Sequence, residues 1–105
     1  GLSVSLNQAG ALSVTTGTIR WYAPAALTVS SVVARLGTAA DDVVGIDIKR
    51  NGSSVRTVSL AAAATSATGS GFTMTAGQYL TIDVTSVGTT AKGNDLNVQL
   101  LYTLD

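Results

Sequence analysis

The chain has 105 residues, of which 46% are hydrophobic and 11% charged, and its six basic and six acidic residues give zero net charge. This length fits one domain with a small core. Zero net charge with dispersed basic residues argues against nucleic-acid binding. Apolar runs are too short for the roughly 18 residues of a transmembrane helix, so membrane insertion is not expected.

The composition favours β-strands. The chain contains 12 valines, 4 isoleucines and 15 threonines, and β-branched residues suit pleated, half-buried surfaces. So few charges are unusual on a soluble surface. Either hydroxyl groups and alanines coat the surface, or part of it is buried against partners. We favour burial, because symmetric assembly is a common way to cover apolar surface.

The N-terminal fifth of the chain predicts three short strand segments. Residues 2–6 alternate apolar residues with serine, which predicts a first strand, although residues 1–8 could instead form an extended arm. A turn is expected at residues 7–10, with further strand residues at 12–14. The aromatic run at residues 18–22 predicts the next strand.

A long strand is expected over residues 27–36. Pro24 separates it from the aromatic strand, since proline cannot donate to a sheet ladder. Ser30-Ser31 interrupts the alternation and predicts a bulge. Residues 37–42 are expected to form a loop.

Asn51-Gly52 predicts a two-residue type I′ hairpin turn, because both central residues of that turn need a positive φ. This turn predicts the cross-strand pairs Arg50 with Ser53, Ile48 with Val55, and Asp47 with Arg56. If the same register continued, Val58 and Leu60 would fall on the wrong face to pair with Val44 and Ile46, which predicts a bulge near Thr57.

The C-terminal half predicts three more strands. Residues 61–70 are expected to form a loop or a single helical turn, since no amphipathic pattern follows the four alanines. The expected strands are 71–75, 79–85 and 95–104; in the second, Leu80, Ile82 and Val84 face inward, and Tyr79, Thr81 and Asp83 face outward. About eight short strands with turns between them predict one all-β domain over residues 1–105, an antiparallel, jelly-roll-like β-sandwich.

The sequence shows no catalytic constellation. The chain lacks histidine and cysteine, so the usual general base and the preferred zinc and copper ligands are absent. Asp41-Asp42 and Asn94-Asp95 place oxygen atoms on loops, where calcium binding is conceivable. Turn formation is the simpler interpretation of both pairs. We therefore expect no enzyme activity, no cofactor and no metal site.

Trp21 and Tyr22 are the most distinctive side chains. Adjacent strand residues point to opposite faces, so one ring is expected in the core and the other in solvent. The exposed ring could stack on a sugar, or it could lie at a subunit interface, and we favour the interface. Tyr79 and Leu101 are further candidates for an exposed apolar contact.

Three segments carry a resemblance to a known group of proteins. They are Gly17–Pro24, Val44–Gly52, and Ala76–Gly88 together with Gly93–Leu96. Their order resembles small jelly-roll modules of tailed-bacteriophage virion proteins, which include head decoration (cement) proteins and domains of tail fibres and baseplates. The resemblance covers about residues 17 to 104 and consists mostly of turns and strand alternation.

The resemblance implies a non-enzymatic virion surface protein, often trimeric, made in the host cytoplasm. We expect a capsid decoration protein that binds the major capsid protein; the alternative is a receptor- or glycan-binding module of a tail fibre or baseplate. A native start at Gly1 after a removed methionine would favour the first role, and a start created by cleavage would favour the second. The expected interface or ligand contacts are Leu2, Val4, Leu6, Trp21, Tyr22 and Tyr79, with residues 1–6 able to add a strand to a neighbour. In the glycan-binding alternative, loop side chains near either Asp41-Asp42 or Lys92, Asn94 and Asp95 are also expected to contact sugar.

Overall fold

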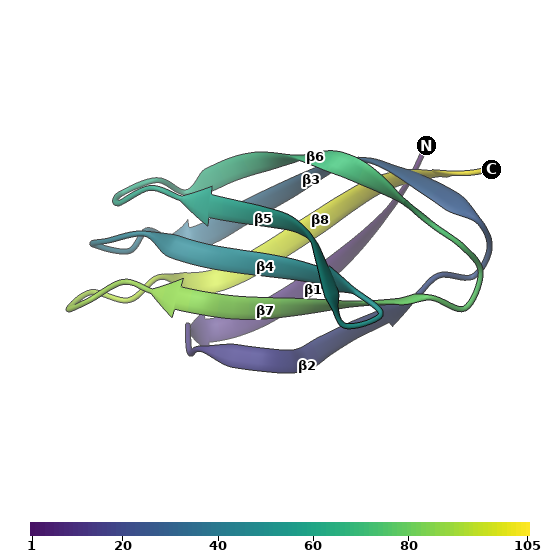
Figure 1. Ribbon diagram of the computed structural model, residues 1–105. Helices are drawn as coiled ribbons and strands as arrows, with labels where there is room; N and C mark the ends of the chain where they lie inside the picture. Colours follow the sequence, from purple (N-terminus) through teal and green to yellow (C-terminus); the bar gives the residue numbers. More distant parts are fainter.

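The computed structural model describes residues 1–105 except for the side chain of Thr18. Its backbone forms eight strands joined by loops and turns, with no helix along the described chain (Figure 1). The strands are β1 Leu2–Ala11, β2 Thr15–Tyr22, β3 Leu27–Thr38, β4 Val44–Arg50, β5 Ser53–Leu60, β6 Ser66–Met74, β7 Tyr79–Val87 and β8 Asn94–Leu104.

The strands form two four-stranded antiparallel sheets, in the orders β1-β8-β3-β6 and β2-β7-β4-β5. The chain passes repeatedly from one sheet to the other, and the two sheets lie face to face (Figure 1). This is the jelly-roll arrangement of two interlocked Greek keys. The predicted all-β, antiparallel, jelly-roll-like sandwich with about eight strands is confirmed.

The core lies between the sheets and is almost entirely aliphatic. The inward positions predicted on β7, Leu80, Ile82 and Val84, are fully buried. The inner positions of β4 and β8 follow the same alternation, as expected for strands with one face against a core. None of the described segments is a helix with the length and apolar character needed to span a membrane.

The hairpin forms at the predicted turn but with a different register. Asn51 and Gly52 have φ values of 50° and 87°, and Arg50 pairs with Ser53 as predicted. The bulge lies at Val55 rather than near Thr57, so Ile48 pairs with Arg56 and Asp47 with Thr57. The predicted pairs Ile48–Val55 and Asp47–Arg56 are therefore wrong.

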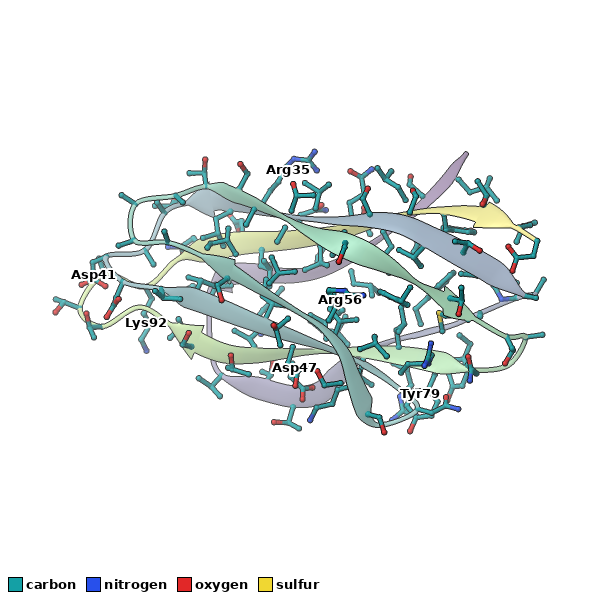
Figure 2. All side chains as sticks on the ribbon, turned by 45° about the horizontal axis from the view of Figure 1, so that its top comes forward. Arg35, Asp41, Asp47, Arg56, Tyr79 and Lys92 are labelled. Carbon is teal, nitrogen blue, oxygen red and sulfur yellow. The ribbon has the colours of Figure 1, made fainter. Side chains whose placement is uncertain are left out.

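The shifted register turns the Arg56 side chain inward. Figure 2 shows this side chain between the two sheets, where its Nη2 donates to the Gly71 carbonyl oxygen on β6 over 2.7 Å. Asp47 stays on the outer face and accepts a hydrogen bond from the Ser54 hydroxyl. One extra residue in a strand is enough to exchange the faces of its neighbours.

Several strand boundaries differ from the sequence-based expectation. β1 continues through the predicted turn at residues 7–10, and residues 12–14 form the connection to β2. β3 extends to Thr38, and β6 begins at Ser66, inside the stretch expected to be a loop. The predicted bulge at Ser30 is confirmed, because the pairing of β3 with β8 shifts between Val29 and Ser31.

Residues 1–8 belong to the β-sandwich rather than to a separate arm. Leu2 to Gln8 pair in continuous register with Tyr102 to Leu96 of β8. β1 is the edge strand of its sheet, so only one of its two backbone edges is paired. Leu6 is buried in the core and Val4 packs partly against it.

Candidate ligand-binding groove

Three neighbouring strands place polar and aromatic side chains together on one outer face. The register puts Tyr22 of β2 opposite Tyr79 of β7, and Arg20 and Lys49 on either side of Thr81. A hollow of about 190 Å³ lies on this face. Its lining residues are Thr16, Gly17, Arg20, Lys49, Gly52, Tyr79, Thr81 and Asp83.

Arg20 is held between two tyrosines. Its Nη1 donates to the Tyr22 hydroxyl over 3.2 Å, and its guanidinium carbon lies 4.3 Å from the centre of the Tyr79 ring. The hydrogen bond to Tyr22 raises the pKa of Arg20 above its ordinary value. The guanidinium covers one face of Tyr79, whereas Tyr22 is 56% exposed. Tyr22 does not line the hollow itself, but it lies next to Arg20 and Tyr79, which do, so its ring is the accessible aromatic surface at the edge of the groove.

Asp83 forms the buried floor of the groove. Its carboxylate lies 2.8 Å from the Lys49 ammonium nitrogen, and the side chains are 5% and 30% exposed, respectively. The backbone N–H of Gly17 also donates to Asp83, over 2.7 Å. Burial raises the pKa of Asp83, but the contacts with Lys49 and Gly17 outweigh that effect, so the net shift is downward. Asp83 is therefore ionised at neutral pH.

The groove is fixed at one end by the β4–β5 hairpin. The Asn51 side-chain oxygen accepts a hydrogen bond from the Tyr79 backbone N–H, and the Asn51 N–H donates to the Tyr79 carbonyl oxygen. These two contacts attach the turn to the start of β7. The turn residue Gly52 thus lines the groove beside Tyr79.

The structure brings two of the sequence-predicted contact residues together. Tyr22 and Tyr79 have ring centres 5.7 Å apart at an interplanar angle of 50°. Trp21 points the other way, packs partly against the core, and lies 5.5 Å from the Tyr102 ring. Of the two adjacent aromatic residues, Trp21 therefore faces the core and Tyr22 faces solvent.

The N-terminal contact residues lie elsewhere and differ in exposure. Leu2 is 47% exposed, Val4 is half-buried, and Leu6 is a core residue. Leu6, which was expected among the contact residues, packs into the sandwich because it occupies an inward position on β1, and its role in an interface stays a prediction. A second hollow, of about 330 Å³, lies beside Leu2 and is lined by Gly1, Leu2, Ser3, Ser30, Leu101, Tyr102 and Thr103.

Asp41 and Asp95 both accept hydrogen bonds from backbone N–H groups. Asp41 accepts hydrogen bonds from the N–H groups of Thr89, Thr90 and Ala91, which lower its pKa to about 2. Asp95 accepts one from the N–H of Gly10. Among the described side chains, acidic groups do not gather in sets of three that could hold a metal ion. Asp41 thus holds the loop between β7 and β8, whereas Asp95, which lies in β8, links that strand to β1.

The loop that Asp41 holds is also remote from the aromatic pair. Figure 2 shows Asp41 and Lys92 at one end of the long axis of the sandwich and Tyr79 near the other end. A single ligand at Tyr22 and Tyr79 would not reach them without extending along the whole sheet. The groove residues that sequence reasoning missed are Arg20, Lys49 and Asp83. The alternation of apolar and polar residues in the sequence places Lys49 and Asp83 on the outward faces of their strands. The ion pair between them depends on how β4 aligns with β7, and the sequence pattern does not specify that register.

No family model matches this sequence, and no curated protein matches it. Solved structures do share its fold. The globular domain of zebrafish complement 1qA protein has a TM-score of 0.56 at 10% identity, covering 97% of this chain and 95% of that chain. CBM35 from Cellvibrio japonicus Abf62 has a TM-score of 0.52 at 18% identity, covering 92% of each chain. These similarities show a common jelly-roll-type β-sandwich.

Proposed function

We propose that this protein is a non-enzymatic glycan-binding module whose site is the groove on β2, β7 and β4. The observation that carries the proposal is the exposed Tyr22 ring beside hydrogen-bonding groups that are already held in place. A sugar ring has an apolar C–H face and a rim of hydroxyl groups. An exposed aromatic ring matches the first, and fixed donors and acceptors match the second.

The polar groups of the groove are well suited to hydroxyl recognition. The Arg20 guanidinium presents several N–H donors in a fixed plane, and the Asp83 carboxylate accepts only. Arg20 is restrained by both tyrosines, and Lys49 by Asp83. Side chains that are restrained before binding lose less conformational entropy when a ligand arrives. The fold similarity to CBM35 is consistent with a binding role, and the argument for sugar rests on the groove itself.

Binding to a panel of neutral, amino and acidic oligosaccharides, followed by titration calorimetry on any that bind, tests the proposal. Tyr22→Ala is expected to weaken binding about tenfold or more, because the stacking surface is lost. Tyr22→Phe keeps the ring and should retain most of the affinity. Gln99→Ala, on the outer face of the opposite sheet, is the matched control and should bind as the unmodified chain does.

Two results would contradict the proposal. One is the absence of binding to every glycan of the panel at concentrations of ~1 mM. The other is a glycan whose affinity is unchanged by Tyr22→Ala and by Arg20→Ala. Circular dichroism of each variant separates a loss of binding from a loss of folding.

The capsid-decoration role and the virion location stay predictions from the resemblance, as does the homotrimer, which competes with the dimer proposed below. Co-sedimentation with undecorated phage capsids tests the first of them. Saturable binding at a fixed copy number per capsomer would support decoration. Binding to intact host cells that depends on Tyr22 would instead support the glycan-binding role.

A further inference from the structure

The four sheet edges of this protein differ in how they are protected. β1 and β6 are the edges of one sheet, and β2 and β5 are the edges of the other. An edge strand carries unpaired backbone N–H and C=O groups, which attract a further strand. Folded proteins usually block such edges with charges, bulges or neighbouring elements.

Three of the four edges carry such features. β2 carries the charged Arg20, and its pairing with β7 is irregular between Thr15 and Ile19. β5 carries Arg56 and the bulge at Val55. β6 lies against β5 across the two sheets, and its Gly71 carbonyl accepts a hydrogen bond from Arg56.

β1 has none of this protection over its first seven residues. Leu2 to Gln8 pair with β8 without a register shift, and the irregularity of β1 falls only beyond Gln8. The strand contains no charged residue and no proline. In Figure 1 the first half of β1 diverges from β2, so that strand does not cover its free edge.

The sequence of this edge is self-complementary. Leu2-Ser3-Val4-Ser5-Leu6 reads the same in both directions. Antiparallel pairing of two such strands about Val4 puts Leu2 opposite Leu6 of the second copy and Ser3 opposite Ser5 of the second copy. The apolar residues then share one face and the serines the other, as period-2 alternation requires.

We propose that β1 pairs with β1 of a second copy of this chain across a twofold axis at Val4. The two β1-β8-β3-β6 sheets then become one continuous sheet. A twofold interface uses the same surface on both subunits, so a palindromic strand gives each subunit the same complementary side-chain contacts. No like charges meet there, because β1 is uncharged.

The exposure along β1 matches this arrangement. Leu2 is 47% exposed at one end of the palindrome, whereas Leu6 is nearly buried at the other end. The twofold axis places Leu2 of each β1 next to Leu6 of the β1 in the second copy. The exposed Leu2 side chain is thereby partly buried against the second copy.

Light scattering of the purified full chain tests the proposal through its mass in solution. The expected mass is twice the 10.5 kDa of the chain. One added strand pair is at the low end of specific interface areas, so the dimer is expected to dissociate in about the micromolar range.

Two double variants test the register. Ser3→Lys with Ser5→Lys puts lysine opposite lysine and should weaken the dimer about a hundredfold or more. Ser3→Lys with Ser5→Asp puts lysine opposite aspartate and should remain dimeric. Both positions are exposed, so each variant is expected to fold, which circular dichroism checks. Ser66→Lys with Thr68→Lys, at exposed positions of the opposite edge strand, is the control and should stay dimeric.

Four results would overturn the proposal. The first three are a monomer at every concentration up to ~1 mM, a trimer, and a dimer that the Lys/Lys variant leaves intact. A dimer that dissociates equally in the Lys/Lys and Lys/Asp variants would also overturn it, because the twofold register at Val4 would then be wrong.

Discussion

Gly10 on β1 and Gly17 on β2 make the same local contact in the two sheets, yet only one belongs to a groove. Both have positive φ values, 74° and 67°, and each donates its N–H to an aspartate over 2.7 Å. Gly10 contacts Asp95 of β8, and Gly17 contacts Asp83 of β7. Asp95 is exposed and Asp83 is buried.

The difference comes from the strand on the far side of each aspartate. Asp83 lies mid-strand with β4 beside it, and Lys49 of β4 reaches across to pair with it. Asp95 lies near the start of β8, with a positive φ of 56°, next to the loop that joins β7 and β8. A third strand, β3, also lies beside Asp95, but the residue it places there is Gly37, which has no side chain to reach across. The glycine–aspartate contact thus becomes the floor of a groove only where the third strand supplies a side chain such as Lys49.

The largest expected difference between the two contacts is in the stability of their aspartate variants. Asp83→Asn removes the counter-ion of Lys49 at a buried position and should lower the free energy of unfolding by about 1–3 kcal/mol. Asp95→Asn keeps a residue that tolerates positive φ and should change it by about 0.5 kcal/mol or less. Urea unfolding measures both. Equal losses would show that Lys49 adds nothing to the Asp83 site.

The two glycines should instead behave alike. A Cβ atom at either position would meet no atom within 4 Å, so the cost of alanine there is the strain of a positive φ. Gly17→Ala and Gly10→Ala should each lower stability by about 1 kcal/mol. Unfolding by urea checks the equality, and a clearly larger loss at Gly17 would mean that the Asp83 contact had been broken as well.

Acid should weaken the protein through the ionised carboxylates. The pKa values of Asp83 and Asp41 are lower in the folded than in the unfolded protein, that of Asp41 being about 2 against an ordinary 3.8. Their contribution to stability is complete above pH ~4 and is lost as the pH falls through the folded-state pKa. Thermal unfolding from pH 6 to pH 2 should show a falling midpoint below pH ~4. Asp41→Asn should flatten this fall, and an unchanged profile would contradict the assignment.

The candidate site was predictable only in part. Tyr22 and Tyr79 were recognisable because large aromatic residues on strands are conspicuous, and alternation placed Tyr79 on the outer face. Thr81 and Asp83 were placed on the same outer face, but their burial was not foreseen, since Lys49 and Gly17 cover Asp83 from other strands. Arg56 was expected to pair with Asp47 and instead lies between the sheets, because the bulge at Val55 shifts the register.

Local sequence determined the approximate position of most strands, where the tightest turn lies, and which side of β7 faces the core. These properties follow from period-2 alternation and from the positive φ that Asn51-Gly52 accepts. Only the tertiary structure decided the register of the hairpin, the inward direction of Trp21, and the meeting of Arg20, Lys49 and Asp83. Those features depend on pairings between segments distant in the chain, and a one-residue bulge, which local propensity constrains weakly, is enough to change them.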